Sequence, residues 1–299
     1  MADRNVLVTG ANGQLGMCIR DVVKLLNSTS TNWVFTDIDE LDITDFNAVR
    51  RFVDDNKINV IVNCAAYTNV DRAEDDQDRA MEINSDAVGN LAIATKITSS
   101  TLIHISTDYV FDGTKHTPYV ETDEPKPIGV YGKTKRSGEK RIERCDCNAV
   151  VIRTAWLYSE YGKNFVKTMA DLFKRKDSVK VVGDQIGTPT YAGDLARLIV
   201  AIVELEQYTK RGLYHFTNEG TASWYDFAVA VKNLLTPDSN CEIISCTTED
   251  YPTRAERPKY SVLSKEKIKD RFGIKIKHWQ DSLAECANKI KEREKLYDA

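Results

Sequence analysis

The stretch NVLVTGANGQLG, Asn5–Gly16, decides the fold predicted for this chain. It begins with an apolar, β-branched run typical of a strand, and an amphipathic helix pattern follows from Gln14. Gly10, Gly13 and Gly16 lie at the junction. One glycine permits a tight turn, one lets backbone N–H groups approach a pyrophosphate, and one lets the helix pack close to the sheet. With the N–H donors of the helix N-terminus, this pattern predicts a dinucleotide site; an ordinary turn is the alternative.

The rest of the first half continues this alternation of strands and helices. Strands are expected at 33–37, 59–66, 101–107 and 149–158, and helices at 14–27, 45–56, 78–99 and 130–145. Nearly continuous apolar strands between helices indicate a parallel sheet covered on both faces. The predicted fold class is therefore α/β: a doubly wound, Rossmann-like parallel sheet with a smaller α/β substrate-binding region at the C-terminal end.

The second half has a less regular pattern. Helices are expected at 164–175, 193–206, 223–235 and the charged C-terminal end, with a strand and turn at 179–191 and a strand at 241–246. We predict a dinucleotide-binding domain over 1–160, with a return of the chain near 186–215, and a mainly substrate-binding region over 161–299. No flexible linker separates them, so we expect a cleft at the carboxyl ends of the strands, where such sheets bind ligands.

The composition of the chain argues against several classes of protein. The chain has 299 residues, 42% of them hydrophobic and 29% charged, and a net charge of −4, which predicts no broad attraction to nucleic acid or to an anionic membrane. No apolar run reaches the roughly 18 residues of a membrane span, and residues 1–10 lack a signal-peptide pattern. Seven scattered cysteines indicate reduced thiols. We expect a cytoplasmic protein without a metal site.

Three residues near the second expected strand point to the adenosine half of a dinucleotide. Asp37 ends that strand about twenty residues past the glycines. A carboxylate there accepts hydrogen bonds from ribose hydroxyls, which favours NADH over NADPH; a helix cap or turn acid is the alternative. Asp42 and Ile43 come next and are expected beside the adenine. The choice between NADPH and NADH stays open.

The segment VYGKTK places Tyr131 and Lys135 on one helix face, because positions i and i+4 are neighbours. Alone, such a pair is typical of a solvated helix face. A ketone reduction needs a proton on oxygen as well as a hydride on carbon, and a nearby ammonium lowers the pKa of a phenol. Thr107 ends strand 101–107 and is placed to donate a hydrogen bond to the same carbonyl oxygen. Ser106 is the neighbouring alternative.

Several segments, in this order, carry a family resemblance: NCAAYTNVDRAE, ISTDYVFDG, VYGKTK, RTAWLY, GDQIGTPTY and RPKYSVLS. With the glycine loop, they resemble the extended short-chain dehydrogenase/reductase family over nearly the whole chain, and in particular its members that act on dTDP-linked sugars. The resemblance implies an NAD(P)H-dependent oxidoreductase that reduces the C4 ketone of a 4-keto-6-deoxyhexose attached to dTDP. A 4-epimerase or dehydratase of the same family and a non-catalytic regulatory subunit are the alternatives.

The resemblance also assigns residues to the two ligands. It implies cofactor contacts at Asn12, Gly13, Gln14, Leu15, Ala65, Ala66, Tyr67 and Thr68. It places the nucleotide-sugar substrate beside Thr107, Asp108, Tyr131, Trp156 and Arg257. The alternative for Trp156 is core packing, and for Arg257 a surface ion pair.

The implied reaction gives three of these residues a role. Tyr131 supplies the proton, Lys135 tunes Tyr131 and positions the cofactor ribose, and Thr107, which the family register favours over Ser106, orients the ketone. Some family members are dimers bridged by magnesium through acidic side chains. The corresponding residues 17–20, MCIR, lack a carboxylate, so no metal is expected, and the chain is predicted to be a monomer or a homodimer.

Overall fold

The computed structural model describes residues 4–26 and 29–297, and its centre is a six-stranded sheet. The strand order is β2 (Thr31–Thr36), β1 (Arg4–Thr9), β3 (Val60–Asn63), β4 (Thr101–Thr107), β5 (Ala149–Thr154) and β10 (Gly212–His215). Every neighbouring pair is parallel. The order reverses between β1 and β3, which opens a crevice at their carboxyl ends. The predicted doubly wound sheet is confirmed.

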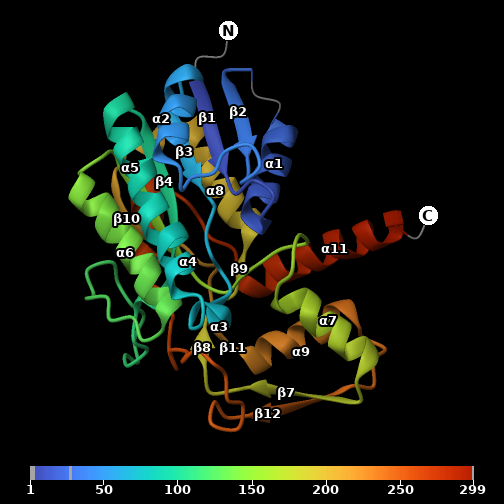
Figure 1. Ribbon diagram of the computed structural model, residues 1–299. Helices are drawn as coiled ribbons and strands as arrows, with labels where there is room; N and C mark the ends of the chain where they lie inside the picture. Colours follow the sequence, from blue (N-terminus) through green and yellow to red (C-terminus); the bar gives the residue numbers. More distant parts are fainter. Residues whose placement is uncertain (1–3, 27–28, 298–299) are drawn as a thin grey trace.

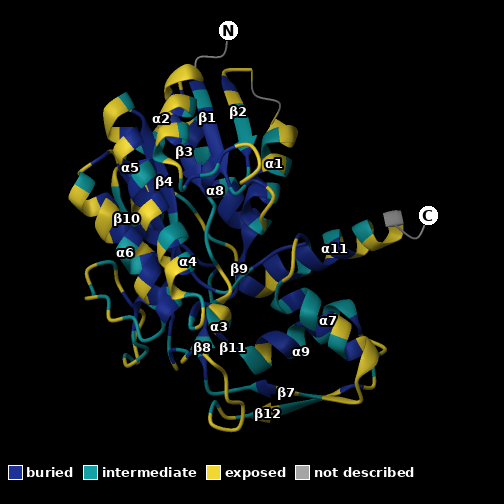
Figure 2. Ribbon diagram, viewed as in Figure 1, coloured by how far each residue is buried: buried dark blue, intermediate teal, exposed yellow. Residues whose placement is uncertain are grey.

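Helices cover both faces of this sheet (Figure 1). One face carries α1 (Gln14–Leu26) and α8 (Ala192–Glu204), and the other carries α2 (Phe46–Asp55), α5 (Ala87–Thr98) and α6 (Val130–Cys145). Along β1, Val6 and Val8 pack toward the first layer and Leu7 toward the second, as the period-two alternation of a strand requires. Figure 2 shows the result: buried strands between helices whose outer surfaces are exposed.

A second lobe lies beyond the carboxyl ends of the strands. Its helices are α7 (Phe165–Arg175), α9 (Trp224–Leu235) and α11 (Trp279–Tyr297). Its short strand pairs are β6 (Leu157–Tyr158) with β9 (Thr190–Tyr191), β7 (Ser178–Val182) with β12 (Glu242–Cys246), and β8 (Ile186–Gly187) with β11 (Ala222–Ser223). Around Phe227 these elements share a separate apolar core. The chain returns to the first lobe through α8 and β10, and α10 (Glu266–Phe272) packs there too.

Several connecting elements lie near the carboxyl edge of the sheet. They are α3 (Val70–Ala73), α4 (Gln77–Met81), a π-helical turn (Glu82–Asp86) and a 3₁₀ turn (Asp108–Val110); a second 3₁₀ turn, Gln207–Thr209, follows α8. The helix predicted at 78–99 therefore changes its hydrogen-bonding pattern within its length. The π-helical turn packs on α6, so it lies close to the helix that carries Tyr131.

One predicted element was wrong. The strand expected over 149–158 ends at Thr154, and β6 pairs with β9 in the second lobe instead of extending the sheet. Trp156 has φ +47°, a left-handed conformation that a strand does not tolerate. The chain therefore turns out of the sheet at Trp156 and carries the indole toward the second lobe. In contrast, the bounds predicted for strand 101–107 and helix 130–145 are confirmed.

Two kinds of feature were searched for within the described ranges. No helix there has both the length and the apolar character needed to cross a membrane. No group of three or more His, Cys, Asp or Glu side chains there is placed to hold a metal ion.

Candidate active site

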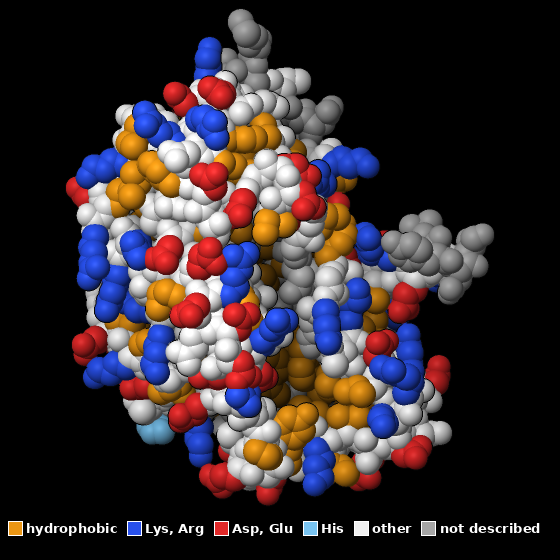
Figure 3. All heavy atoms as spheres, viewed as in Figure 1, with side chains coloured by type: hydrophobic (Ala, Val, Ile, Leu, Met, Phe, Trp, Pro, Cys, Tyr) orange, Lys and Arg blue, Asp and Glu red, His pale blue; other side chains and the backbone are white. Residues whose placement is uncertain are grey.

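A cleft of about 880 Å³ lies where the two lobes meet. Figure 3 shows the hollow, with hydrophobic side chains at its floor and charged side chains along its rim. It brings together most of the residues predicted from the sequence: Gly10, Asn12, Gly13, Gln14, Leu15, Asp37, Asp42, Ile43, Ala65, Ala66, Thr68, Ser106, Thr107, Asp108, Tyr131, Lys135 and Trp156. Gly16, Tyr67 and Arg257 are not among its lining residues.

The glycine loop requires glycine for steric reasons. Gly10 has φ +63°, and a Cβ there would lie 2.6 Å from the Cα of Ala65, which follows β3. At Gly16 a Cβ would lie 2.5 Å from the Cα of Ala11, so this glycine lets α1 begin close to its own loop. Any larger residue at these two positions would displace backbone. The loop thus presents bare backbone at the β1/β3 crevice, a surface that fits a pyrophosphate.

The Asp37 carboxylate lies at the adenosine end predicted for the cleft. Its Oδ2 accepts a hydrogen bond from the Asn12 N–H at 2.9 Å, and its Oδ1 accepts one from the Ile38 N–H at 2.9 Å. The same carboxylate therefore braces the glycine loop. Nearby, hydrogen bonds from the backbone and hydroxyl of Thr44 lower the pKa of Asp42.

Tyr131, Thr107 and Lys135 line the same cleft. The Lys135 Nζ donates to the Ile105 carbonyl at 2.7 Å. Burial raises the pKa of Tyr131 to about 12, although Thr107 lies close enough to the phenol to oppose this rise. Burial lowers the pKa of Lys135 to about 8, although the Glu139 charge raises it. The sequence predicted a lowered pKa for the Tyr131 phenol. That prediction is wrong, because desolvation raises this pKa by more than the neighbouring groups lower it.

Unsatisfied polar atoms gather on this wall of the cleft. Thr107 Oγ1 donates to Asp108 Oδ1 at 3.1 Å, and burial raises the pKa of Asp108 to about 6. Ser261 lies close enough to lower that pKa, yet Asp108 Oδ2 has no hydrogen bond of acceptable geometry within the described residues. The hydroxyls of Thr154 and Tyr158, which also line the cleft, lack partners there too. Because buried polar atoms are normally paired, this wall is suited to a polar ligand.

The second lobe supplies an aromatic wall. Trp156 stacks on Trp224 with ring centroids 3.6 Å apart and planes 10° apart. A Cβ at Gly187 would lie 2.6 Å from the Trp156 ring, so the absence of a side chain there lets the indole lie flat. Trp156 is half-buried and lines the cleft, so it does not belong wholly to the core. Trp224 is half-buried and lines the cleft as well, so both indoles can contact a ligand there.

Sequence reasoning missed several residues of the cleft. They include Arg79, Tyr109, Lys163, Asn164 and Trp224, besides Thr154 and Tyr158. Asn164 Nδ2 donates to Gln14 Oε1 at 2.9 Å and ties the second lobe to the glycine loop. The only local signal was its place before a helix, where its side chain accepts from the Lys167 N–H as an N-cap. Its contact with Gln14 joins residues 150 positions apart and has no sequence signal.

Arg257 and Tyr67 lie outside the lining of the cleft. The Arg257 guanidinium makes a bidentate ion pair with Asp71 at 2.7 and 3.1 Å, and its charge opposes the burial that raises the pKa of Tyr109. The ion pair predicted as the alternative for Arg257 is therefore present, and its phosphate contact stays a prediction. The Tyr67 hydroxyl donates to Asp76 at 3.1 Å.

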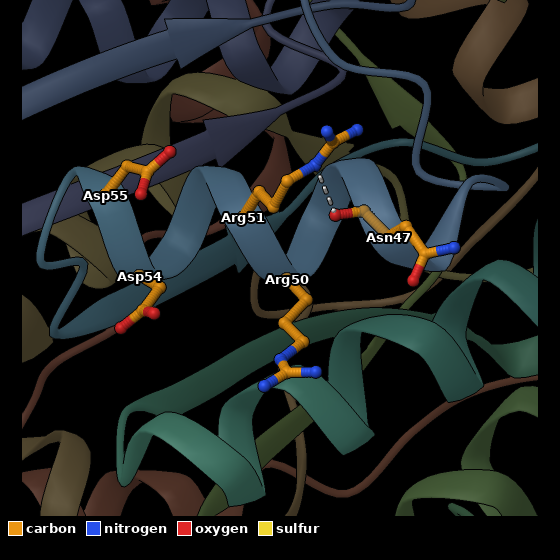
Figure 4. Close-up of a pocket in the computed structure, with 5 residues that line it drawn as sticks. All are labelled: Asn47, Arg50, Arg51, Asp54 and Asp55. Atoms are coloured by element: carbon orange, nitrogen blue, oxygen red, sulfur yellow. Dashed lines mark hydrogen bonds between the residues drawn. The ribbon is translucent and has the colours of Figure 1, made fainter.

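Another hollow, of about 500 Å³, lies over α2 (Figure 4). Its lining residues are Asn47, Arg50, Arg51, Asp54 and Asp55, all from one helix. The Arg51 Nε donates to the Asn47 backbone carbonyl at 3.3 Å. Two arginines are followed one turn later by two aspartates, and none of the predicted site residues is present. This hollow is a charged helix surface, and the cleft between the lobes is the candidate active site.

The doubly wound sheet, the glycine loop after β1 and the Thr107–Tyr131–Lys135 group together define an extended short-chain dehydrogenase/reductase. Residues 4–292 match the family model described as "RmlD substrate binding domain", and the chain belongs to this family. A protein of Aggregatibacter actinomycetemcomitans named dTDP-4-dehydrorhamnose reductase is 44% identical over 286 residues, covering 93% of this chain and 96% of its own.

Two solved structures of proteins with the same name are also similar. The protein of Clostridium acetobutylicum is 42% identical, with a TM-score of 0.90 over 96% of this chain and 99% of that one. The protein of Bacillus anthracis, solved in complex with NADP, is 36% identical, with a TM-score of 0.88 over 96% and 99% of the two chains. The similarity therefore covers both lobes.

Proposed function

We propose that this chain is an NAD(P)H-dependent oxidoreductase that reduces dTDP-4-dehydro-L-rhamnose to dTDP-L-rhamnose at the C4 ketone. The observation that carries the proposal is that Tyr131, Thr107 and Lys135 line the same cleft as the glycine loop. Relatives named dTDP-4-dehydrorhamnose reductase match over nearly the full length, which supports the choice of sugar nucleotide. The division into a cofactor region (1–160) and a mainly substrate-binding region (161–299) is part of the proposal.

The residues present fit a reduced nicotinamide dinucleotide. The glycine loop leaves no room for a side chain at Gly10, and Asp37 lies where a ribose is expected. When bound, the reduced dinucleotide supplies the hydride. Asp37 favours the unphosphorylated ribose of NADH, whereas the Bacillus anthracis relative was solved with NADP; the proposal therefore includes both cofactors.

The chain's own groups handle the proton and the developing negative charge. With its pKa raised to about 12 by burial, Tyr131 is protonated at neutral pH and is therefore in the form that donates. Its hydroxyl gives the proton to the C4 oxygen, while Thr107 donates a hydrogen bond that holds the carbonyl and stabilises the alkoxide. When the Lys135 ammonium lies close to the phenol, its positive charge favours loss of the phenolic proton. Trp156 and Asp108 flank the sugar in this arrangement.

An assay with purified protein tests the proposal. The protein is incubated with dTDP-4-dehydro-L-rhamnose and either NADH or NADPH, and absorbance of the reduced nicotinamide is followed. We expect stoichiometric loss of absorbance and formation of dTDP-L-rhamnose. An epimerase or dehydratase regenerates its cofactor, so product formation without net loss of absorbance would contradict a reductase. Copurification with a synthetase and no ketone reduction would favour a regulatory subunit.

The remaining partner predictions concern assembly and location. We propose a sugar nucleotide as the small-molecule partner, a monomer or homodimer as the assembly, and the cytoplasm as the location. Sedimentation equilibrium of the purified chain separates monomer from homodimer.

A further inference from the structure

A buried ion pair lies directly behind the catalytic group. Glu139 is 2% exposed and Arg153 is 1% exposed. The Arg153 guanidinium donates to both carboxylate oxygens of Glu139, at 2.8 and 2.7 Å. Ser106 Oγ donates to the same carboxylate at 2.6 Å, and Arg136, nearer the surface, donates at 3.0 Å. Burial opposes ionisation of Glu139, but these donors, Arg153 first, hold its pKa below the ordinary value.

This ion pair joins the two elements that carry the catalytic residues, α6 and β4, to the neighbouring strand β5. Glu139 lies on α6, which carries Tyr131 and Lys135. Ser106 precedes Thr107 at the end of β4, and Arg153 precedes Thr154 at the end of β5. One carboxylate therefore fixes α6 against the ends of two strands. Ser106 is thus bonded to the Glu139 carboxylate, whereas the neighbouring Thr107 donates to Asp108, which lines the cleft.

The Glu139 charge also acts on Lys135, where it raises the pKa against the larger effect of burial. The two residues are four positions apart on the buried face of α6, so their side chains are neighbours. The other titratable groups facing Lys135 are Tyr131, four positions earlier on α6, Cys64, after β3, and His104, on β4. Tyr131 is neutral, because burial raises its pKa to about 12. Burial raises the pKa of the Cys64 thiol to about 12 and lowers the pKa of His104 well below its usual value, so both are neutral. Of the groups known to face Lys135, only Glu139 is an anion.

We propose that Glu139 is a positioning residue for the reductase: its carboxylate keeps Lys135 an ammonium and holds α6, with Tyr131, in register with Thr107. It acts through Lys135 and Ser106 and does not touch the substrate. The proposal rests on the proposed function, because it assigns Lys135 a role in catalysis and cofactor binding. A buried ion pair with a purely structural role would stabilise the fold without altering the titration of Lys135.

Glu139→Gln separates these two roles, because it keeps the shape and removes the charge. Loss of the anion lowers the pKa of Lys135, so Lys135 loses its proton at lower pH. We expect the alkaline limb of the pH profile of kcat to shift to lower pH by roughly one unit or more. The alkaline limb of the pH profile of reduced-cofactor binding should shift in the same direction. Glu143→Gln is the matched control: Glu143 lies one turn further on α6 and also pairs with Arg136, at 2.6 Å, but its side chain is 55% exposed.

A second variant keeps the test decisive if Glu139→Gln does not fold. Glu139→Gln leaves Arg153 buried with its charge unpaired, so Glu139→Gln/Arg153→Gln, which removes both charges, is measured alongside. A downward shift in either folded variant, absent in Glu143→Gln, supports the proposal. If the variants fold and their alkaline limbs match the wild-type limb, the proposal is overturned. It is also overturned if both variants fail to fold while Glu143→Gln folds, because the ion pair then has a purely structural role.

The cofactor-binding arm keeps this test separate from the proposed function. NADPH and NADH binding is followed by nicotinamide fluorescence across pH without any sugar nucleotide. If the wild-type chain bound the cofactor but reduced no ketone, the proposed function would fail, while the effect of Glu139 on Lys135 would still be measured. If the chain reduced the ketone and neither pH limb moved in the folded variants, only the role of Glu139 would fail.

Discussion

Two buried polar clusters flank α6 and differ in how completely they are hydrogen-bonded. The front cluster, Thr107, Asp108 and Tyr131, faces the cleft; burial raises the pKa of both its acid and its phenol, and Asp108 Oδ2 lacks a partner among the described residues. In the rear cluster, Ser106, Glu139 and Arg153, the carboxylate accepts bonds from both other members. The comparison indicates that the rear cluster provides rigidity, while the front cluster leaves bonding capacity for a ligand, at a cost in stability.

The largest expected effect is loss of the proton donor from the front cluster. Tyr131→Phe removes one hydroxyl and keeps the ring that packs edge-on against Tyr109 at 5.8 Å. We expect kcat to fall by about 10³-fold or more, while the Kd for NADPH or NADH changes less than about threefold. Steady-state kinetics and fluorescence titration measure the two quantities. A variant that kept most of its turnover would show that another group donates the proton.

Breaking the rear cluster is expected to affect stability most. Arg153→Met leaves the Glu139 carboxylate buried without its main partner, which costs about 3–5 kcal/mol in the free energy of unfolding. Urea denaturation followed by circular dichroism measures this loss. Glu139→Leu/Arg153→Met should recover much of it, since no buried charge remains. A single variant less than about 1 kcal/mol below wild type would contradict a buried, desolvated pair.

The two neighbouring hydroxyls at the end of β4 distinguish the clusters. Thr107→Val keeps the shape and removes the donor, so we expect kcat to fall by about 10²-fold. Ser106→Ala removes a contact of the rear cluster, and a smaller loss of kcat is expected. Both kcat values come from the same ketone-reduction assay. A larger loss for Ser106→Ala than for Thr107→Val would mean that the two hydroxyls have the reverse roles.

The smallest predicted effect concerns stability against pH. Burial raises the pKa of Asp108 from 3.8 to about 6 in the folded chain, so its contribution to stability is present below about pH 4 and lost as pH rises through about 6. The loss is at most about 3 kcal/mol. Asp108→Asn cannot titrate, so its stability relative to wild type should rise between pH 4 and 7. Urea titrations at several pH values check the difference, and parallel curves for the two proteins would refute it.

Motif order predicted much of the fold and of the site. The strand 101–107 and the helix 130–145 have the predicted bounds, because both follow from local hydrophobic patterns. The run 149–158 was misread as one strand, since a β-branched pattern does not reveal that Trp156 adopts φ +47°. The pKa of Tyr131 was predicted in the wrong direction, because spacing along a helix gives proximity to Lys135 but no information on burial.

By itself the sequence determined the alternation of strands and helices, the need for glycine at Gly16, where a Cβ would meet Ala11, and the shared helix face of Tyr131 and Lys135, since each depends on neighbours within a few residues. Only the tertiary structure decided that Asn164 contacts Gln14, that Trp156 stacks on Trp224 and that Arg153 pairs with Glu139. These contacts join separate elements, and their energies depend on desolvation, which arises only when the lobes and layers have packed.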